Sequence, residues 1–381
     1  MFKNYNKVIL FLYLLGALFL TSCWGGEKRG VSNAENIQTD SLKYAKGVKI
    51  EYFKNYTQVS VVNPWDTTKL LQNYILIDRN EPKPENLPAG TIIKVPINNA
   101  IVYSSVHTSI LEALESVDLI AGVCEVEYID SKEIKNLVKE GKIADCGVSN
   151  TPNIEKIIEK NGEIIIASPF ENSNYGQAEK LGIPIFEAAD YMENTPLGRA
   201  EWVKVYGLLS GRKEMADSIF VVTEKNYNQL KKLANNGEKK PRLLAERKYG
   251  SAWFVPAGYS YMGELYTDAG ADYIYRKIKK TNSEPLPFEQ VFEEGKSADI
   301  WVFKYAMDRN ITYNDIKTEN PLYAQLNAFK NKTIYTCNTL STSYYADITL
   351  YPDKILKDLV YIFHPSAIEK DYTPKYFFKV E

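Results

Sequence analysis

The chain has 381 residues, of which 45% are hydrophobic and 25% charged, a composition typical of a folded protein long enough for two domains. Its 46 basic and 48 acidic residues leave a formal net charge of −2, so no overall field attracts nucleic acid or an anionic membrane surface. The 28 tyrosines suit either a surface that binds large, partly apolar ligands or a Tyr-rich surface without a ligand. A disordered chain and a general nucleic-acid-binding protein are therefore excluded.

The N-terminus has the pattern of an export signal. Two lysines precede an apolar run at 8–20, which is too short to span a bilayer comfortably and ends in Leu20-Thr21-Ser22-Cys23. This pattern resembles a bacterial lipoprotein signal, residues 1–23, in which Cys23 is acylated on sulfur and becomes the new N-terminus. The alternative is a plain secretory signal, which would also place the chain outside the cytoplasm.

The segment after the signal predicts a tether. Residues 24–44 are polar and small, without a helical or strand period, and would let the folded part stand off the membrane. We therefore expect a membrane-anchored lipoprotein on the periplasmic side, with display on the cell surface as the alternative.

The remaining cysteines are odd in number. If lipid occupies Cys23, we predict a disulfide between Cys124 and Cys146, which fall in one predicted domain, and a buried free thiol at Cys337. Three buried thiols are the alternative. No Cys-x-x-Cys motif or Cys/His cluster occurs, so we predict no bound metal and no cofactor.

Hydrophobic patterning changes near residue 100. Before it, short β-branched or aromatic segments separated by Pro- and Gly-containing turns predict a β-rich N-terminal region with strands at 48–53, 58–62, 74–77 and 91–96. After it, strands alternate with helices, which predicts a parallel α/β sheet. These elements are strands at 100–103, 119–124, 164–167 and 183–187, and helices at 108–114, 153–160 and 175–181.

A helical segment divides the chain. Residues 196–237 lack a strand signal and carry apolar residues at helical spacing, interrupted by Gly211. We predict helices at 197–210 and 212–234, the second about 35 Å long. Alternation restarts after Pro241 and ends in a helix at 352–363. The predicted fold class is therefore α/β, with two Rossmann-like α/β lobes at 45–195 and 238–381, a single long helix joining them within 196–237, and a ligand groove between the lobes.

Several stretches carry a family resemblance. In the first lobe they are 101–105, 108–114, 118–123, 152–158 and Leu181-Gly182-Ile183-Pro184, and in the second 268–271, 286–291 and 298–300. Behind a lipobox, they resemble the ABC-importer substrate-binding proteins for vitamin B12, iron-siderophores and haem, the rigid-linker class of periplasmic binding proteins. Glu115 stands where Gly is usual in that family.

The resemblance implies a monomeric binding protein and not an enzyme. It would take a metal-chelate small molecule and deliver it to a permease driven by its ATPase. In such proteins an acidic residue on each lobe docks with arginine pockets of the permease, and Glu171 and Glu289 occupy matching places. The alternative is that each carboxylate interacts with a helix dipole.

The ligand groove is expected where strands end and loops converge. Arg247 and Lys248 could answer an anionic ligand, and Thr339 begins a loop that joins the groove. For the aromatic residues the alternative is core packing, and for His107 it is a hydrogen-bonded cap and not an axial metal ligand. The predicted ligand-binding residues are Ser104, Ser105, His107 and Tyr128 from the first lobe, and Trp253, Tyr259, Ser260, Tyr261, Tyr344 and Tyr345 from the second.

The sequence leaves several classes of ligand and of function as alternatives. An iron complex, either a ferric siderophore or haem, is the first hypothesis, and a corrinoid is the second. Other function classes are a lipoprotein adaptor that binds another protein through its Tyr-rich groove, and an exported hydrolase that uses Glu125 and Glu127 as paired carboxylates. Gly-x-Ser-x-Gly, phosphate-binding and His-Glu-x-x-His motifs do not occur, which disfavours the hydrolase.

Overall fold

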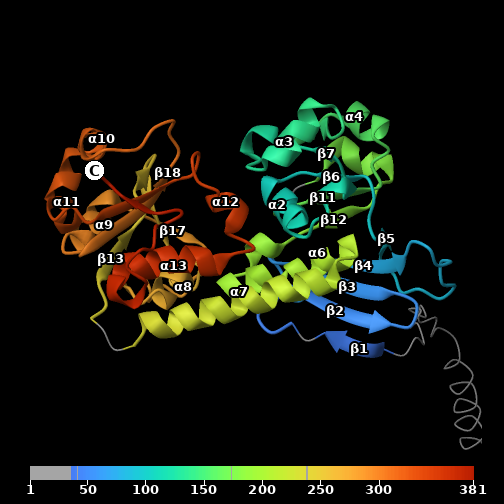
Figure 1. The fold of residues 1–381 in the computed structure, drawn as a ribbon, viewed down its shortest axis with the longest axis horizontal. Helices are drawn as coiled ribbons and strands as arrows, with labels where there is room; N and C mark the ends of the chain where they lie inside the picture. Colours follow the sequence, from blue (N-terminus) through green and yellow to red (C-terminus); the bar gives the residue numbers. More distant parts are fainter. Residues whose placement is uncertain (1–35, 41, 173, 237–238) are drawn as a thin grey trace, which may run out of the picture.

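A computed structural model of the chain describes residues 36–381 except 41, 173 and 237–238. Two α/β lobes lie side by side, and one long helix, α7 (Lys213–Ala234), runs along the base of both (Figure 1). The predicted signal at 1–23, its lipidated Cys23 and the tether up to residue 35 lie outside the described residues. Among the helices of the described ranges, none combines the length and apolarity needed to cross a membrane.

The N-terminal region forms a five-stranded sheet beneath the first lobe (Figure 1). Its first four strands are antiparallel, and the fifth runs parallel to the fourth. Val48 and Ile50 are buried while Lys49 between them is exposed, because alternate side chains of a strand point to opposite faces. The strands are β1 (Asn36–Asp40), β2 (Val48–Phe53), β3 (Thr57–Val62), β4 (Leu70–Asp78) and β5 (Thr91–Val95).

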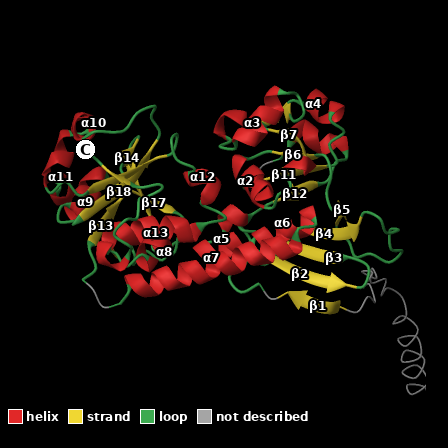
Figure 2. Cartoon of the chain, viewed as in Figure 1, coloured by secondary structure: helices red, strands yellow, loops and turns green. Residues whose placement is uncertain are grey.

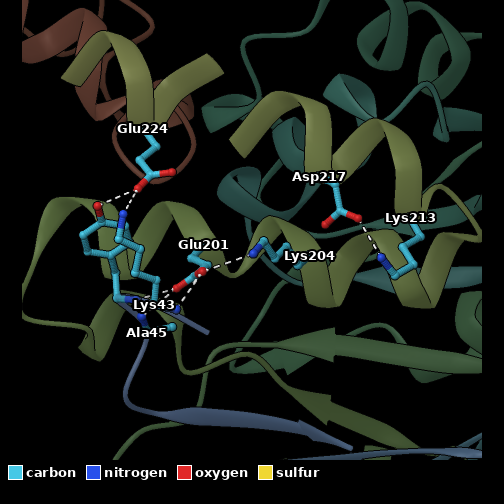
Figure 3. A network of polar contacts seen from close by, with 8 residues as sticks. Lys43, Ala45, Glu201, Lys204, Lys213, Asp217 and Glu224 are labelled. Carbon is cyan, nitrogen blue, oxygen red and sulfur yellow. Dashed lines mark hydrogen bonds and ion pairs between the residues drawn. The ribbon is translucent and has the colours of Figure 1, made fainter. Parts of the chain in front are cut away.

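The prediction of a tether that extends to residue 44 is wrong from Asn36 onward, because β1 pairs with β2. Glu201 fixes the segment that follows: its fully buried carboxylate accepts the backbone N–H groups of Lys43, Tyr44 and Ala45 at 3.0, 2.7 and 2.9 Å (Figure 3). Glu224 of α7 pairs with the Lys43 ammonium at 2.5 Å and accepts the Tyr44 hydroxyl at 2.7 Å. The buried carboxylate satisfies three backbone donors outside any ladder, so the N-terminal sheet is held to the helical segment.

The first lobe contains a parallel sheet in the order β12-β11-β6-β7-β8. Its strands are buried along their whole length at Ala100–Val102 and Ile164–Ala167, as expected for a parallel sheet with helices on its faces (Figure 2). The elements are β6 (Ala100–Val102), α2 (Ser105–Ala113), β7 (Ile120–Val123), α3 (Lys132–Lys139), β8 (Ala144–Asp145), β9 (Gly147–Val148), β10 (Thr151–Pro152), α4 (Ile154–Glu159), β11 (Ile164–Ala167) and β12 (Ile185–Glu187).

Three helices join the lobes: α5 (Pro196–Glu201), α6 (Val203–Ser210) and α7. Gly211 ends α6, as the sequence predicted, and does so in the left-handed conformation with φ +71°. Helix α7 has 22 residues and is about 33 Å long. Its Phe220 is buried in the first-lobe core and its Tyr227 in the second-lobe core, so one rigid element belongs to both cores.

The second lobe has a sheet in the order β16-β13-β18-β19-β20, parallel except for β20, and a separate antiparallel sheet β14-β15-β17. The antiparallel sheet was not predicted. The elements are β13 (Arg242–Ala245), β14 (Lys248–Tyr249), β15 (Ala252–Pro256), α8 (Tyr261–Asp268), β16 (Asp272–Tyr273), β17 (Ser283–Leu286), α9 (Phe288–Gly295), β18 (Ile300–Tyr305), α10 (Tyr313–Glu319), α11 (Asn327–Lys330), β19 (Ile334–Asn338), α12 (Tyr344–Asp347), α13 (Pro352–Phe363) and β20 (Phe378–Lys379).

Short 3-10 helices connect several of these elements. The segment predicted as an α-helix at 175–181 is one of these 3-10 helices, η3. It begins after Tyr175 and ends at Gly182, which has the left-handed conformation. The 3-10 helices are η1 (Val117–Leu119), η2 (Val126–Tyr128), η3 (Gly176–Leu181), η4 (Asp190–Met192), η5 (Pro321–Gln325) and η6 (Pro365–Ala367).

The predicted disulfide between Cys124 and Cys146 is not present, since both residues are buried free thiols, like Cys337. They follow the paired residues Val123 and Asp145 at the ends of adjacent strands and share one apolar cluster. Burial raises the pKa of Cys124 far above its ordinary value and that of Cys146 to about 11. The thiolate that would form a disulfide is therefore strongly disfavoured.

Candidate ligand-binding cleft

Two cavities lie where the lobes face each other. The first-lobe cavity has a volume of about 490 Å³, and the second-lobe cavity about 940 Å³. Tyr345 of α12 lines both of them, and α12 packs against α2 of the first lobe (Figure 1). The two cavities therefore meet at one aromatic side chain, and together they are called the cleft.

The first-lobe cavity forms at the carboxyl ends of parallel strands, where loops of an α/β sheet converge. Ser104 and Ser105 follow β6, Glu125 follows β7, and Ser168 follows β11. Tyr128 also lines the cavity and is 62% exposed. The second lobe closes the cavity with Thr339, Leu340 and Tyr345. Ser104, Ser105, Tyr128 and Tyr345 are thus placed together by the structure.

His107 is not part of the cavity wall, so its predicted ligand-binding role is wrong. The side chain is 1% exposed and uses both ring nitrogens: Nε2 bonds to Ser168 Oγ at 3.0 Å and Nδ1 to the Tyr206 hydroxyl at 2.7 Å. Burial lowers the pKa of His107 to about 4, so the ring is neutral near pH 7. Since Ser168 lines the cavity, His107 orients a cavity residue from behind.

Ser260 and Tyr261 line the second-lobe cavity at the start of α8, and their ligand-binding role stays a prediction. The Ser260 hydroxyl accepts from the backbone N–H of Gly263 and so caps the helix. Tyr261 is 6% exposed, its hydroxyl donates to the Ile348 carbonyl at 2.6 Å, and the Arg199 guanidinium lies 4.2 Å from its ring centroid. This ring is therefore held rigidly in the cavity wall.

Arg247 and Lys248 also line this cavity, but carboxylates form salt bridges with two of its four cations. Arg247 pairs with Glu319, and Lys304 pairs with Glu246. Burial alone would lower the pKa of Lys304, yet Glu246 raises it above the ordinary value, so the ammonium stays charged. Salt bridges within the protein therefore neutralise two of the positive groups that face this cavity.

Two predicted cleft aromatics belong instead to the second-lobe core. Trp253 is fully buried, its indole N–H donates to the Ala245 carbonyl at 3.1 Å, and its ring packs against Trp301 with a centroid separation of 6.0 Å. Tyr344 is also fully buried, and its hydroxyl lies 3.2 Å from the Met262 sulfur. Each ring points inward from its element, so these two predictions are wrong.

Tyr259 is 48% exposed but does not line either cavity. Aromatic residues that the sequence did not single out take its place. Trp65, in the loop between β3 and β4, lines the second-lobe cavity, and Phe170 and Tyr175 line the first. The turn at Asn63-Pro64-Trp65 is the one signal that could have identified Trp65, because a large aromatic in a Pro-containing turn seldom serves a core.

The two acidic residues predicted to dock with a permease lie in different settings. Glu289 is exposed in the first turn of α9. Glu171 is exposed but lines the second-lobe cavity. In the first lobe, exposed Glu155 in the first turn of α4 has the position along its helix that Glu289 has in α9.

Known proteins share this architecture. Residues 101–339 match the family model described as "Periplasmic binding protein". The N-terminal sheet β1–β5 precedes the matched range. The chain is 28% identical to an uncharacterised lipoprotein of Methanocaldococcus jannaschii, over 94% of this chain and 92% of that protein.

Solved structures of the same fold include an ABC-type Fe3+-hydroxamate transport system protein of Saccharomonospora viridis, with a TM-score of 0.55 and 17% identity over 71% of this chain and 95% of that one. A periplasmic haem-binding protein, HutB of Vibrio cholerae, has a TM-score of 0.55 and 16% identity over 70% of this chain and 99% of that one. At such identities the likeness shows the fold.

Proposed function

The chain belongs to the periplasmic binding protein family, and from that premise we propose that it captures an iron complex, a ferric siderophore or haem, for an ABC importer. The family consists of solute-binding proteins and not enzymes, as the sequence predicted. The observation that carries the proposal is the cleft between the lobes, whose two cavities meet at Tyr345. Its volumes are in the range of sites for bulky small molecules.

The side chains of the cleft explain how such a complex would be held. The rings of Tyr128, Phe170 and Tyr345 can cover the faces of a chelate and remove its apolar surface from water. The hydroxyls of Ser104 and Ser105 can hydrogen-bond its rim. A corrinoid, which has a large ring and a polar rim, is the alternative cargo.

The joining helix predicts a small closure on binding. Because α7 belongs to the cores of both lobes through Phe220 and Tyr227, a hinge motion would have to break packing in one of them. We expect small-angle scattering profiles with and without cargo to be nearly superimposable. A large compaction on binding would contradict the rigid connection.

Delivery is proposed to use the lipid anchor at Cys23 and exposed carboxylates that dock with the permease. Glu289 and Glu171 are the proposed docking residues, and Glu155 competes with Glu171 for the first-lobe role because of its matching place on α4. Uptake of labelled cargo by cells carrying Glu289→Gln, Glu171→Gln or Glu155→Gln separates these roles. A docking residue lowers uptake without changing the affinity of the isolated protein, whereas a cleft residue changes the affinity.

The first test is a tryptophan-fluorescence titration of residues 24–381 with ferric siderophores, haemin and cyanocobalamin, corrected for absorption by the ligands. Trp65 lines the cleft, so a bound cargo quenches it. Saturable submicromolar quenching by one chelate class supports the proposal and identifies the cargo. If none of the three ligand classes quenches the fluorescence, the protein is assigned instead as an adaptor that binds another protein.

A further inference from the structure

The two cavities of the cleft differ in charge. Three carboxylates, Glu125, Glu127 and Asp130, line the first-lobe cavity, and none of the described residues that line it is a Lys, Arg or His. The second-lobe cavity carries both signs. Its charged lining residues are Arg199, Arg247, Lys248, Lys304, Glu171, Glu193 and Glu246.

The cations of the second lobe are largely compensated within the protein. Lys304 pairs with Glu246, Arg247 pairs with Glu319, and both pairs are part-buried. Lys248 and Arg199 are the exceptions, since neither forms a salt bridge within the described ranges, but Arg199 interacts electrostatically with Asp190, and the exposed Glu171 in the same wall balances the charge of Lys248. This cavity therefore presents little net positive charge to a ligand.

The three carboxylates of the first-lobe cavity have no such salt-bridge partners among the described residues. Glu125 accepts the backbone N–H and the hydroxyl of Ser149 at 2.9 and 2.8 Å, which orients the carboxylate without neutralising it. Glu127 forms no hydrogen bond or salt bridge with any part of the chain that the structure describes. The uncompensated charge of this cavity is negative.

Asp130 has charged neighbours but no salt bridge in the described ranges. Lys135, Asp347 and Lys375 act on it electrostatically, and Lys375 is itself paired with Asp347 at 2.5 Å. Burial raises the pKa of Asp130 although Lys135 and Lys375 act to lower it, so the surroundings of this carboxylate do not fully stabilise its negative charge. A positive group that entered the cavity would do so.

Aromatic rings reinforce this preference. Tyr128 and Tyr345 are both more than half exposed at the cavity, and the negative face of a phenol ring attracts a cation. An anion in the same place would meet like charge at short range in a partly desolvated cavity. Neither wall therefore offers a polyanionic chelate a compensated site.

We propose that the first-lobe cavity receives a positively charged group of the cargo, so that the cleft selects cationic metal chelates over anionic ones. The inference rests on the proposed function, because it assigns a charge class to the cargo of that cleft. It favours chelates built on neutral or cationic frameworks and disfavours trianionic catecholate complexes and the propionates of haem.

The test is isothermal titration calorimetry of residues 24–381 with three ferric chelates of different charge. Ferrioxamine B is a cationic trihydroxamate, ferrichrome a neutral one, and ferric enterobactin a trianionic catecholate. We expect affinity to fall in that order. The double variant Glu127→Gln, Asp130→Asn should weaken the cationic chelate about three- to tenfold and leave the neutral chelate unchanged.

The control variant, Glu85→Gln, removes an equal kind of charge from an exposed loop outside the cleft and should change neither affinity. Thermal melts show that each variant is folded. Tightest binding of the anionic chelate, or equal loss of the cationic and neutral chelates in the double variant, overturns the charge assignment and leaves the proposed function standing. Binding of none of the chelates, together with a silent fluorescence titration, overturns both.

Discussion

The two lobes share a parallel-sheet architecture but fill it differently. The first-lobe core is built mainly from Ile, Val, Leu and Ala, whereas the second-lobe core concentrates Trp, Tyr and Phe. Buried Trp and Tyr usually hydrogen-bond their polar group, and three of them in the second lobe do so with backbone carbonyls: Trp253 donates to Ala245, Trp301 to Glu246 and Tyr273 to Pro256. Many aromatic residues of the second lobe therefore belong to its core, although Tyr345 lines the cleft, and in the first lobe several aromatic residues line the cleft.

The largest expected loss of stability comes from a substitution that disrupts the aromatic core of the second lobe. Trp253→Ala should lower the free energy of unfolding by about 4 kcal/mol, because it removes a fully buried ring and leaves a cavity among Trp301, Phe288 and Tyr323. Urea denaturation followed by circular dichroism measures the loss. Trp65→Ala is the matched control and should cost less than about 1 kcal/mol, since its ring is at the cleft surface. Similar losses of unfolding free energy in the two variants would refute the assignment of Trp253 to the core and Trp65 to the cleft surface.

A second effect tests how the first lobe is held to the helical segment. Glu201→Ala should cost about 3 kcal/mol, because three backbone N–H groups and the Lys204 ammonium lose a buried partner. The control Glu224→Gln alters a part-exposed pair with Lys43 and should cost less than about 1 kcal/mol. The denaturant midpoints of both variants are compared. A Glu201→Ala variant as stable as Glu224→Gln would show that the Glu201 carboxylate does not hold the two segments together.

Buried titratable groups beside the first lobe give a pH test. The folded pKa of His107, about 4, lies below the unfolded value of 6.5, so the unfolded state binds more protons between these values and stability falls as pH drops through that window. The folded pKa of Asp190, raised by burial to about 6 from 3.8, acts in the opposite sense: its stabilising contribution is present near pH 4 and is lost as pH rises toward 6. The two groups oppose each other in the wild-type protein.

Removing one of the two groups should reveal the pH dependence of stability that the other contributes. Between pH 4 and pH 6 the stability of Asp190→Asn should rise relative to wild type by about 3 kcal/mol, since a pKa shift of one unit corresponds to about 1.4 kcal/mol. Urea melts across this range measure the difference. For His107→Gln the difference from wild type should have the opposite slope. Parallel pH profiles for all three proteins would show that these buried groups are not shifted as described.

The smallest effect concerns fluorescence. Trp65→Phe should abolish most of the quenching by cargo while changing stability by less than about 0.5 kcal/mol, because Trp65 is the tryptophan among the described residues that lines the cleft. Trp202, Trp253 and Trp301 are fully buried and should keep their emission. Quenching that survives in Trp65→Phe would place the cargo elsewhere.

Much of the fold follows from the sequence, because hydrophobic period and turn residues act locally. The strands at 48–53 and 164–167 and the helix at 352–363 have the predicted bounds, and Gly211 divides the helices as expected. The antiparallel sheet β14-β15-β17 was missed, since its two-residue strand and its pairing across residues 257–282 leave no local period.

The site was predicted less completely. Ser104, Ser105 and Tyr128 line the cleft because they follow strand ends or occupy an exposed turn, and Tyr345 lines it from the short helix α12. The orientation of a side chain depends on what its neighbours leave open, so Trp253, Tyr344 and His107 could not be distinguished from cleft residues by type alone. Trp65 was missed because it reaches the second-lobe cavity from the N-terminal sheet, a contact made only in three dimensions.

The most direct measurement is a crystal structure of residues 24–381 with the iron chelate that quenches fluorescence, solved with anomalous scattering from iron. The account predicts an iron peak in the cleft with the chelate in contact with Tyr345 and with both lobes. An iron peak on the outer surface, or a chelate that touches one lobe only, would contradict it.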